Sequence, residues 1–140
     1  MVRAVIRSRA AAYAAMVALP LALGVASYAV LRSWVPLVGA HAALWPTAPR
    51  VLRDHFADAA WGFALGAFVS LVWLDQKRAH RLAWVAIAAL AAAGIELLQS
   101  ASVLRGVFDP VDLVVQTGSV MVAAMVIGGM KRWTWVSETR

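Results

Sequence analysis

A polar stretch at residues 96–116 interrupts an otherwise apolar chain. It holds three carboxylates, those of Glu96, Asp109 and Asp112. It also holds three polar side chains that are able to form hydrogen bonds, those of Gln99, Arg105 and Gln116. Positioned carboxylates transfer protons in general acid–base catalysis or hold polar ligands. Acids at membrane depth are costly and mark functional sites. Residues 96–116 are therefore where the sequence predicts a site.

A second polar group lies upstream, with Asp54, His55 and Asp58 followed by Trp61. Asp54 and Asp58 are four residues apart and share a helical face, as do Glu96 and Gln99, which are three apart. Asp109, Asp112 and Gln116 follow the i, i+3, i+7 pattern of one face. The spacing predicts three polar helix ends.

The composition indicates a membrane protein. The 140 residues are 63% hydrophobic and 14% charged, whereas average chains are about 25% charged. The length favours one domain over residues 1–140, and the lack of cysteine excludes disulfides and thiolate sites. The net charge of +6 is scattered at the ends of apolar runs, which indicates topology signals and no nucleic-acid partner.

Four apolar runs are long enough for helices that cross a bilayer core of about 30 Å. The predicted spans are residues 10–31, 54–74, 82–99 and 111–130, which gives an all-α, four-helix transmembrane bundle. Pro20 predicts a kink in the first span. The charged start and A-H-A at residues 40–42 also fit a signal peptide, although the apolar run exceeds a usual signal core.

Prolines and tryptophans mark the connectors. Three prolines and two tryptophans predict an interfacial segment at residues 32–53: Trp34, Pro36, Trp45, Pro46 and Pro49. The second span begins with Asp54 and Asp58, which we predict to lie in the first turn of its helix. Acids in a first turn suit the helix macrodipole. The alanine-rich third span predicts a helix inside the bundle, because small residues let helices approach closely in lipid.

The basic residues predict the topology. Nine lie on the side of the termini, at Arg3, Arg7, Arg9, Lys77, Arg78, Arg81, Lys131, Arg132 and Arg140, and four lie opposite, at Arg32, Arg50, Arg53 and Arg105. The positive-inside rule places both termini in the cytoplasm. The three polar helix ends then meet at the extracytoplasmic face.

At these residues the chain resembles the VanZ-like family of small bacterial membrane proteins, over residues 50–128. The resemblance rests on E-x-x-Q, G-x-F-D-x-x-D, a glycine in the last span and D-x-x-W: Glu96, Gln99, Gly106, Phe108, Asp109, Asp112, Gly118, Asp58 and Trp61. His55 aligns loosely with a family histidine, and Gln116 replaces a frequent asparagine. The resemblance implies a multi-helix protein of the bacterial inner membrane and a link to the cell envelope.

Two interpretations of the polar residues stay open. In the first, Glu96, Asp112 and Asp58 are catalytic candidates, and an envelope lipid or a peptidoglycan-related ligand is bound by Gln99, Arg105, Asp109, Gln116, His55 and Trp61. In the second, Arg105 neutralises Asp109 or Asp112, Gln99 caps a helix end, and the network only holds helices together in a scaffold or assembly partner. For Asp54 and Asp109, at helix starts, capping is the favoured role.

Other chemistries have less support. Asp54, His55, Asp58, Glu96 and Asp112 could offer oxygen and imidazole ligands, but no H-x-x-x-H or H-E-x-x-H spacing occurs. We predict no metal site and no cofactor. Ser100, Ser102 and Ser119 have no base at readable spacing, and an ion pathway would need acids along the whole depth. We predict that a lipid bilayer surrounds the protein, and the sequence does not predict the oligomeric state.

Overall fold

The computed structural model describes residues 2–31, 49–104 and 108–138 and is helical throughout its regular elements. The helices are α1 (Val2–Leu31), α2 (Arg50–Val72), α3 (Arg78–Ser100) and α4 (Pro110–Glu138). Each is long and apolar enough to cross a membrane, which is the architecture of a multi-pass membrane protein. The predicted all-α, four-helix fold class is confirmed. The interfacial segment expected at residues 32–53 lies mostly outside the described residues.

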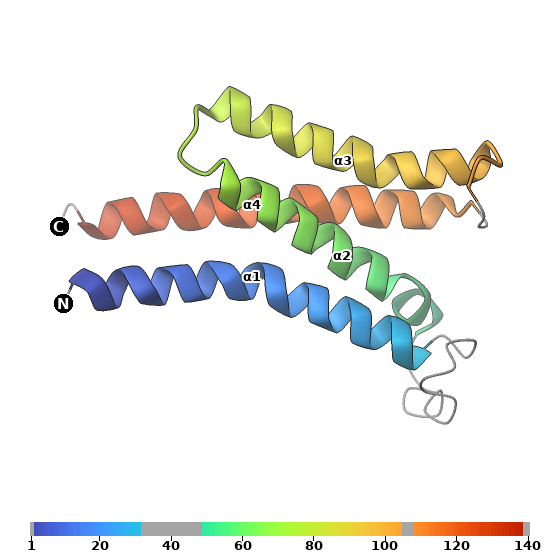
Figure 1. Ribbon diagram of the computed structural model, residues 1–140, viewed down its shortest axis with the longest axis horizontal. Coiled ribbons are helices and arrows are strands. Elements are labelled where there is room, and N and C mark those ends of the chain that lie inside the picture. The colour runs from blue at the N-terminus through green and yellow to red at the C-terminus, as the bar shows by residue number, and fades with distance from the viewer. Residues whose placement is uncertain (1, 32–48, 105–107, 139–140) are drawn as a thin grey trace.

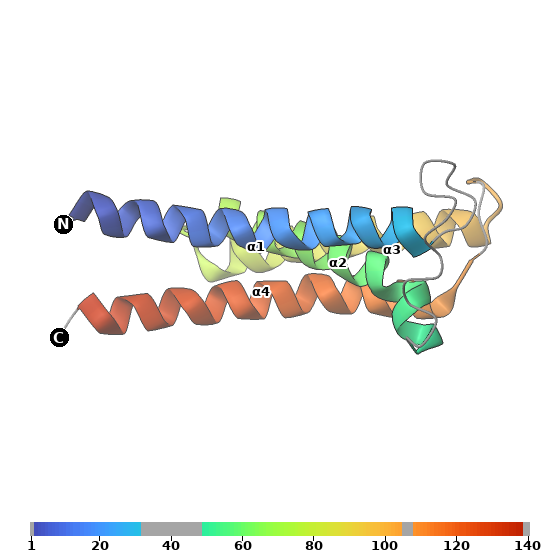
Figure 2. The ribbon, with the colours of Figure 1, turned by 90° about the horizontal axis from the view of Figure 1, so that it is seen from below.

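The helices run along one another, and both chain termini lie at the same end (Figure 1). The view turned by 90° shows that α1 and α4 both run along most of the length of the molecule (Figure 2). We call the opposite end, where α2 begins, α3 ends and α4 begins, the polar end. It brings the three predicted polar helix ends to one place.

Every helix extends past its predicted span at one end at least, although α2 ends at Val72, two residues before the predicted end of its span. α1 begins at Val2, α2 at Arg50 and α3 at Arg78, and α4 continues to Glu138. Hydropathy reports only the part of a helix that matches the hydrocarbon core, whereas backbone hydrogen bonding continues into the interface. α1 also continues through Pro20 and bends near its middle (Figure 1), as transmembrane helices tolerate.

The start of α2 corrects one expectation. Asp54 and Asp58 were predicted in the first turn of the second span, but α2 begins at Arg50 after Pro49, and its first turn holds no acid. Asp54 lies one turn further in and is exposed, and no side chain caps this helix end. The macrodipole argument therefore does not apply to these two acids, since the effect fades beyond the first turn.

The helix inside the bundle is α2 and not the alanine-rich α3. α2 packs against each of the other three helices, and 39% of its span is buried against 22% of the α3 span. The alanines of α3 point in several directions, so only Ala88 and Ala92 join Val85 in the core. Alanine permits close packing in lipid but does not drive it, because lipid tails are as apolar as the protein interior.

Two glycines of α2 set its contact with α4. A Cβ placed on Gly62 would lie 2.5 Å from the backbone oxygen of Gln116, and one placed on Gly66 would lie even closer to that of Val120. Only glycine permits this approach of two backbones, which is the packing that G-x-x-x-G motifs provide in membranes. The register of α2 on α4 is fixed by these two contacts.

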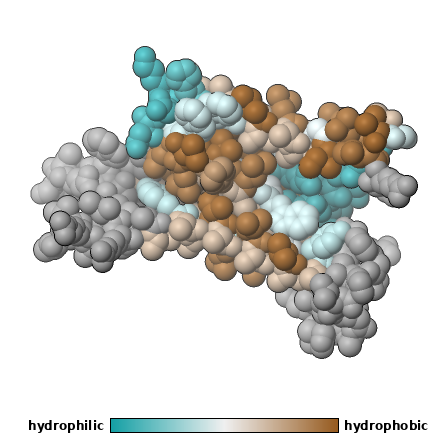
Figure 3. Space-filling model, viewed as in Figure 1, coloured by the Kyte–Doolittle hydropathy of each residue, from teal (hydrophilic) through white to brown (hydrophobic). Residues whose placement is uncertain are grey.

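The hydrophobic core contains two small clusters of buried residues, and both involve α4. One joins Val85, Ala88 and Ala92 of α3 to Val120 of α4. The other joins Ala67 of α2 to Ala123 and Ile127 of α4, with Met16 and Val17 of α1 packed against it. The outward surface is also apolar, since Leu90 is 71% exposed and Val114 is 68% exposed. Figure 3 shows this hydrophobic surface over the middle of the helices. Such an outer surface suits lipid and not water.

The turns that join the helices are held by specific contacts. Trp73 and Trp84 stack with ring centroids 4.8 Å apart and link the end of α2 to the start of α3. α3 ends in a Schellman motif, in which the Val103 N–H donates to Leu98 and the Ser102 N–H donates to Gln99. Ser102 takes the left-handed conformation there, with φ of 57°. This motif turns the chain back toward the start of α4.

We expect Gly62→Ala to lower the thermal unfolding midpoint of the purified protein in detergent. The added methyl would meet the backbone of Gln116, and overpacking of this kind costs about 1–3 kcal/mol. Gly118→Ala is the control, since a Cβ there meets no atom within 4 Å and alanine favours helix by about 1 kcal/mol. Equal midpoints for the two variants would contradict the proposed close contact.

Candidate functional site

The polar end brings six of the predicted site residues together as three hydrogen-bonded pairs, which link α2 to α4 and α3 to the start of α4. We call this group the polar cluster. It consists of His55 and Asp58 from α2, Glu96 from α3, Asp109 immediately before α4, and Asp112 and Gln116 from α4. Figure 3 shows hydrophilic surface at this end, separated by the hydrophobic band from the hydrophilic surface near the α2–α3 turn.

The shortest contact of the polar cluster joins His55 to Asp112. Nδ1 of the imidazole lies 2.5 Å from Oδ1 of the carboxylate, and the side chains are 13% and 18% exposed. An ionised carboxylate only accepts hydrogen bonds, so Nδ1 carries the shared proton. Nε2 of His55 has no hydrogen-bond partner among the described residues. This arrangement leaves Nε2 able to exchange a proton with a third group.

A second contact joins the same two helices. Nε2 of Gln116 donates to Oδ1 of Asp58 over 3.0 Å, and both side chains are half-buried. Asp58 lies one turn before Gly62, and the backbone of Gln116 is what Gly62 packs against. The close approach of the backbones therefore brings these two side chains within reach.

Asp109 caps the start of α4, as the sequence predicts. Its Oδ1 accepts a hydrogen bond from the Val111 N–H over 2.8 Å, and its backbone oxygen accepts the first helical bond from Leu113. Pro110 follows at the first helical position, where its fixed φ suits the helix and its missing N–H is no loss. Asp109 thus has a structural role besides its place in the polar cluster.

Glu96 is the buried acid of the polar cluster, with an exposure of 5%. Its Oε2 accepts a hydrogen bond from the backbone N–H of Asp109 over 3.3 Å, which joins the last turns of α3 to the start of α4. The carboxylate thus lies at the positive end of the α4 macrodipole. This favourable field and the hydrogen bond offset part of the cost of burying a charge.

The geometry selects a different set of possible metal ligands from the sequence. One donor atom each from His55, Asp109 and Asp112 lies within 4.8 Å of the other two. The sequence suggests Asp54, Asp58 and Glu96 beside His55 and Asp112, and it does not suggest Asp109. Three ligands leave positions for water, as in catalytic zinc sites, but calcium takes six to eight oxygens. The absence of a metal stays a prediction.

Trp61 has a packing role outside the hydrogen-bonded polar cluster. Its ring lies 5.4 Å from that of Tyr28, centroid to centroid, and a Cβ on Gly24 would collide with the indole. These contacts hold α1 against α2. The indole N–H is buried and has no hydrogen-bond partner in the part of the chain that is described.

Three other predicted residues are not among the six that form the hydrogen-bonded pairs of the polar cluster. The side chain of Gln99 is half-buried without a hydrogen-bond partner among the described residues, so it caps no described helix end. Asp54 is exposed at the second turn of α2. Arg105 lies outside the described residues, and so does its expected pairing with Asp109 or Asp112.

Sequence reasoning missed the residues that make the polar cluster possible. Gly62 and Gly66 form a G-x-x-x-G pattern inside the second span, which is a recognisable signal for close helix pairing in membranes. Comparison of the chain with models of protein families, with curated proteins and with solved structures found no match.

We expect His55 and Asp112 to be coupled in a double-mutant cycle. His55→Ala, Asp112→Asn and the double variant should give a coupling free energy of about 0.5–2 kcal/mol, since side chains that share a hydrogen bond are not additive. Unfolding in a detergent titration measures it. The control cycle pairs Asp112→Asn with His80→Ala in the exposed first turn of α3 and should be additive. Additivity in both cycles would contradict the contact.

Proposed function

We propose that this chain is a VanZ-like protein of the bacterial inner membrane, and that its polar end binds or acts on a component of the cell envelope at the extracytoplasmic face. The observation that carries the proposal is the Asp112–His55 pair, which orients an imidazole between two helices. The ligand class and the side of the membrane come from the resemblance and from the distribution of basic residues.

The pair suggests a definite chemical role. A carboxylate bonded to Nδ1 holds a histidine in one tautomer and orientation, and the opposite nitrogen then serves as a general base or acid. Asp109 lies close enough to both to add negative charge. We infer that His55 accepts a proton from, or hydrogen-bonds to, a hydroxyl or amine of the envelope component, with Asp112 holding the imidazole in place.

The surrounding acids favour such a ligand over an anionic one. Within the described part of the polar end, Asp54, Asp58, Glu96, Asp109 and Asp112 supply the carboxylates. Like charges disfavour a bound phosphate or carboxylate, whereas amines and hydroxyls donate to carboxylate oxygens. Glu96 and Asp58 then serve to position neighbours, since Glu96 accepts a hydrogen bond from the Asp109 backbone and Asp58 accepts one from Gln116.

The resemblance to the VanZ-like family also supports a site at the polar end. E-x-x-Q places Glu96 beside the start of α4, and the D-x-x-D pair supplies Asp109 and Asp112. The four acids that carry the resemblance, Asp58, Glu96, Asp109 and Asp112, thus all belong to the polar cluster. A link to the cell envelope follows by analogy with that family and not from the geometry.

A scaffold is the second candidate function, and one observation favours it. Three hydrogen bonds of the polar cluster link one helix or helix end to another, and each involves an acid of the polar cluster. Networks of this kind hold transmembrane helices together at about 0.6 kcal/mol per hydrogen bond. In this alternative the polar end orders the bundle for an assembly partner, and no ligand is needed.

A cell-based experiment separates the two functions. The chain is expressed in a bacterial host that is challenged with antibiotics acting on the cell envelope, and survival is compared with that of Asp112→Asn, Glu96→Gln and His55→Gln. We expect the variants to lose the effect of the wild-type chain on survival at unchanged membrane abundance, because they remove the charge or base but nearly keep the shape. Asp75→Asn, in the α2–α3 turn, is the control.

Abundance decides between the outcomes. If the three variants lower membrane abundance in an immunoblot and survival falls in proportion, the scaffold function is supported and the site proposal is wrong. Full survival at normal abundance with Asp112→Asn would also contradict a role for the Asp112–His55 pair.

The proposed topology has its own test, which the lack of cysteine makes simple. Gln76→Cys and Ala101→Cys each introduce one thiol at an exposed position, in the α2–α3 turn and at the end of α3. In intact cells, a membrane-impermeant maleimide should label Ala101→Cys and leave Gln76→Cys unlabelled until the membrane is opened. The reverse pattern would place the polar end in the cytoplasm.

A further inference from the structure

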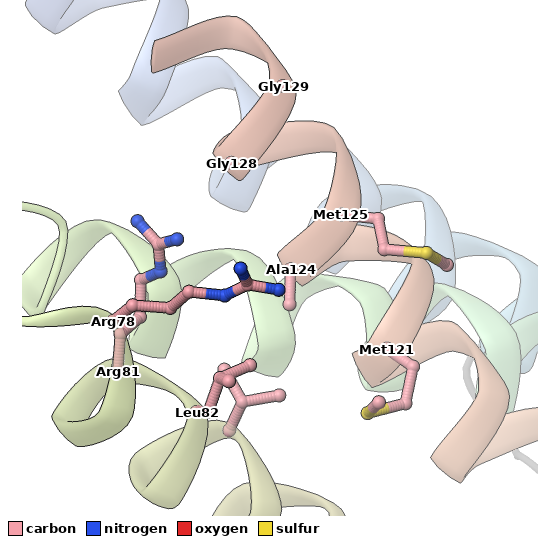
Figure 4. A pocket seen from close by; sticks show the side chains of 9 residues that line it. Arg78, Arg81, Leu82, Met121, Ala124, Met125, Gly128 and Gly129 are labelled. Atoms are coloured by element: carbon pink, nitrogen blue, oxygen red, sulfur yellow. The ribbon is translucent and has the colours of Figure 1, made fainter. Parts of the chain in front are cut away.

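A groove between α3 and α4 lies away from the polar cluster, near the α2–α3 turn. Its volume is about 290 Å³, at the lower limit of ligand sites. It is lined by Arg78, Arg81, Leu82 and Val85 from α3 and by Met121, Ala124, Met125, Gly128 and Gly129 from α4. Figure 4 shows both arginine side chains extending from α3 into the space beside α4.

The two arginines have no ion pair or hydrogen bond that would neutralise them within the part of the chain that the structure describes. Arg81 is half-buried, and a guanidinium nitrogen lies 3.8 Å from where a Cβ of Gly128 would be. The guanidinium of Arg81 therefore lies beside α4 at Gly128.

The rest of the groove is apolar and lies within the predicted membrane spans. Leu82 and Val85 form one wall, and Met121 and Met125 form the other. Met125 is 65% exposed and Leu82 is 49% exposed, so the groove opens toward the surrounding lipid. Methionine side chains adapt to irregular flexible ligands. A chain of methylene groups fits such walls, whereas a soluble anion contacts only the arginines.

We propose that this groove binds an anionic phospholipid from the surrounding leaflet. Arg78 and Arg81 hold the phosphate, and one acyl chain lies between the α3 and α4 side chains. Guanidinium groups bind phosphate by paired, charge-assisted hydrogen bonds, and basic pockets between transmembrane helices bind anionic lipid head groups. The arginines that line this groove distinguish it from the polar cluster, whose charged groups are carboxylates and a histidine.

The occupant is a lipid and not a soluble phosphate, because the two arginines and the apolar walls of the groove form one continuous surface. Arg78 and Arg81 are one turn apart at the start of α3, and Leu82 and Val85 follow them on the same side of that helix. A phospholipid has the same order of groups along its length, from charged phosphate to acyl chain. Both parts of the ligand are therefore matched without any change in the protein.

The test uses the full-length protein in nanodiscs and titrates phosphatidylglycerol against phosphatidylcholine with the same acyl chains, read by native mass spectrometry. We expect phosphatidylglycerol to bind preferentially. Arg81→Gln should weaken its binding about tenfold, as expected for the loss of a charge-assisted contact to phosphate. Lys77→Gln removes the same charge from an exposed residue that does not line the groove, and it should change the affinity less than about twofold.

A second variant tests the apolar part. Gly129 lines the groove, and a Cβ there meets no atom within 4 Å, so Gly129→Leu is designed to add an apolar side chain to the groove while both arginines are kept. We expect it to weaken phosphatidylglycerol binding, and circular dichroism reports whether each variant is folded. If Arg81→Gln does not fold, Gly129→Leu alone decides.

Three results would overturn the proposal. The first is equal loss with Arg81→Gln and Lys77→Gln, which would indicate only a general surface charge. The second is wild-type binding with Gly129→Leu. The third is complete displacement of the lipid by millimolar glycerol phosphate, which would make the groove a site for a soluble phosphate. None of these outcomes bears on the polar end, so the two proposals fail independently.

Discussion

The close approach of α2 and α4 at Gly62 and Gly66 is the constraint on which the rest of this structure depends. Lipid supplies no hydrophobic force between helices, so packing and interhelical hydrogen bonds must hold the bundle. Gly62 and Gly66 face the backbone at Gln116 and Val120. They let the two helices come close enough for both packing and interhelical hydrogen bonds. The bond between Asp58 and Gln116, one turn away, depends on that distance, and so does the pairing of His55 with Asp112 near the helix ends.

The polar cluster shows how a membrane protein keeps acids near the bilayer at moderate cost. Glu96 is buried, but it accepts the Asp109 N–H at the positive end of α4. Asp109 caps the same helix, and Asp112 bonds a histidine. Each acid thus has a partner that stabilises its charge. The same bonds pre-orient His55, so stabilisation of the bundle and preparation of a site come from one arrangement of side chains.

The two ends of the bundle differ in how their charges are compensated. At the polar end the acids are bonded to neighbouring helices, which ties the site to the fold. Near the α2–α3 turn, Arg78 and Arg81 have no described partner and border an apolar groove. The arginines beside the groove and the carboxylates of the polar cluster suit ligands of opposite charge. The positive-inside rule, from which the topology was predicted, uses these same arginines.

The sequence by itself determined the four helices and the polar residues at their ends, because hydropathy over about 20 residues and polar spacing are local properties. It also predicted the Asp109 cap, which depends on neighbours in the chain. Only the tertiary structure decided that α2 is the inner helix, that His55 pairs with Asp112, and that Gln99 and Trp61 stay outside the polar cluster. These features depend on the rotation and register of one helix against another, which the glycine contacts set and no local periodicity encodes.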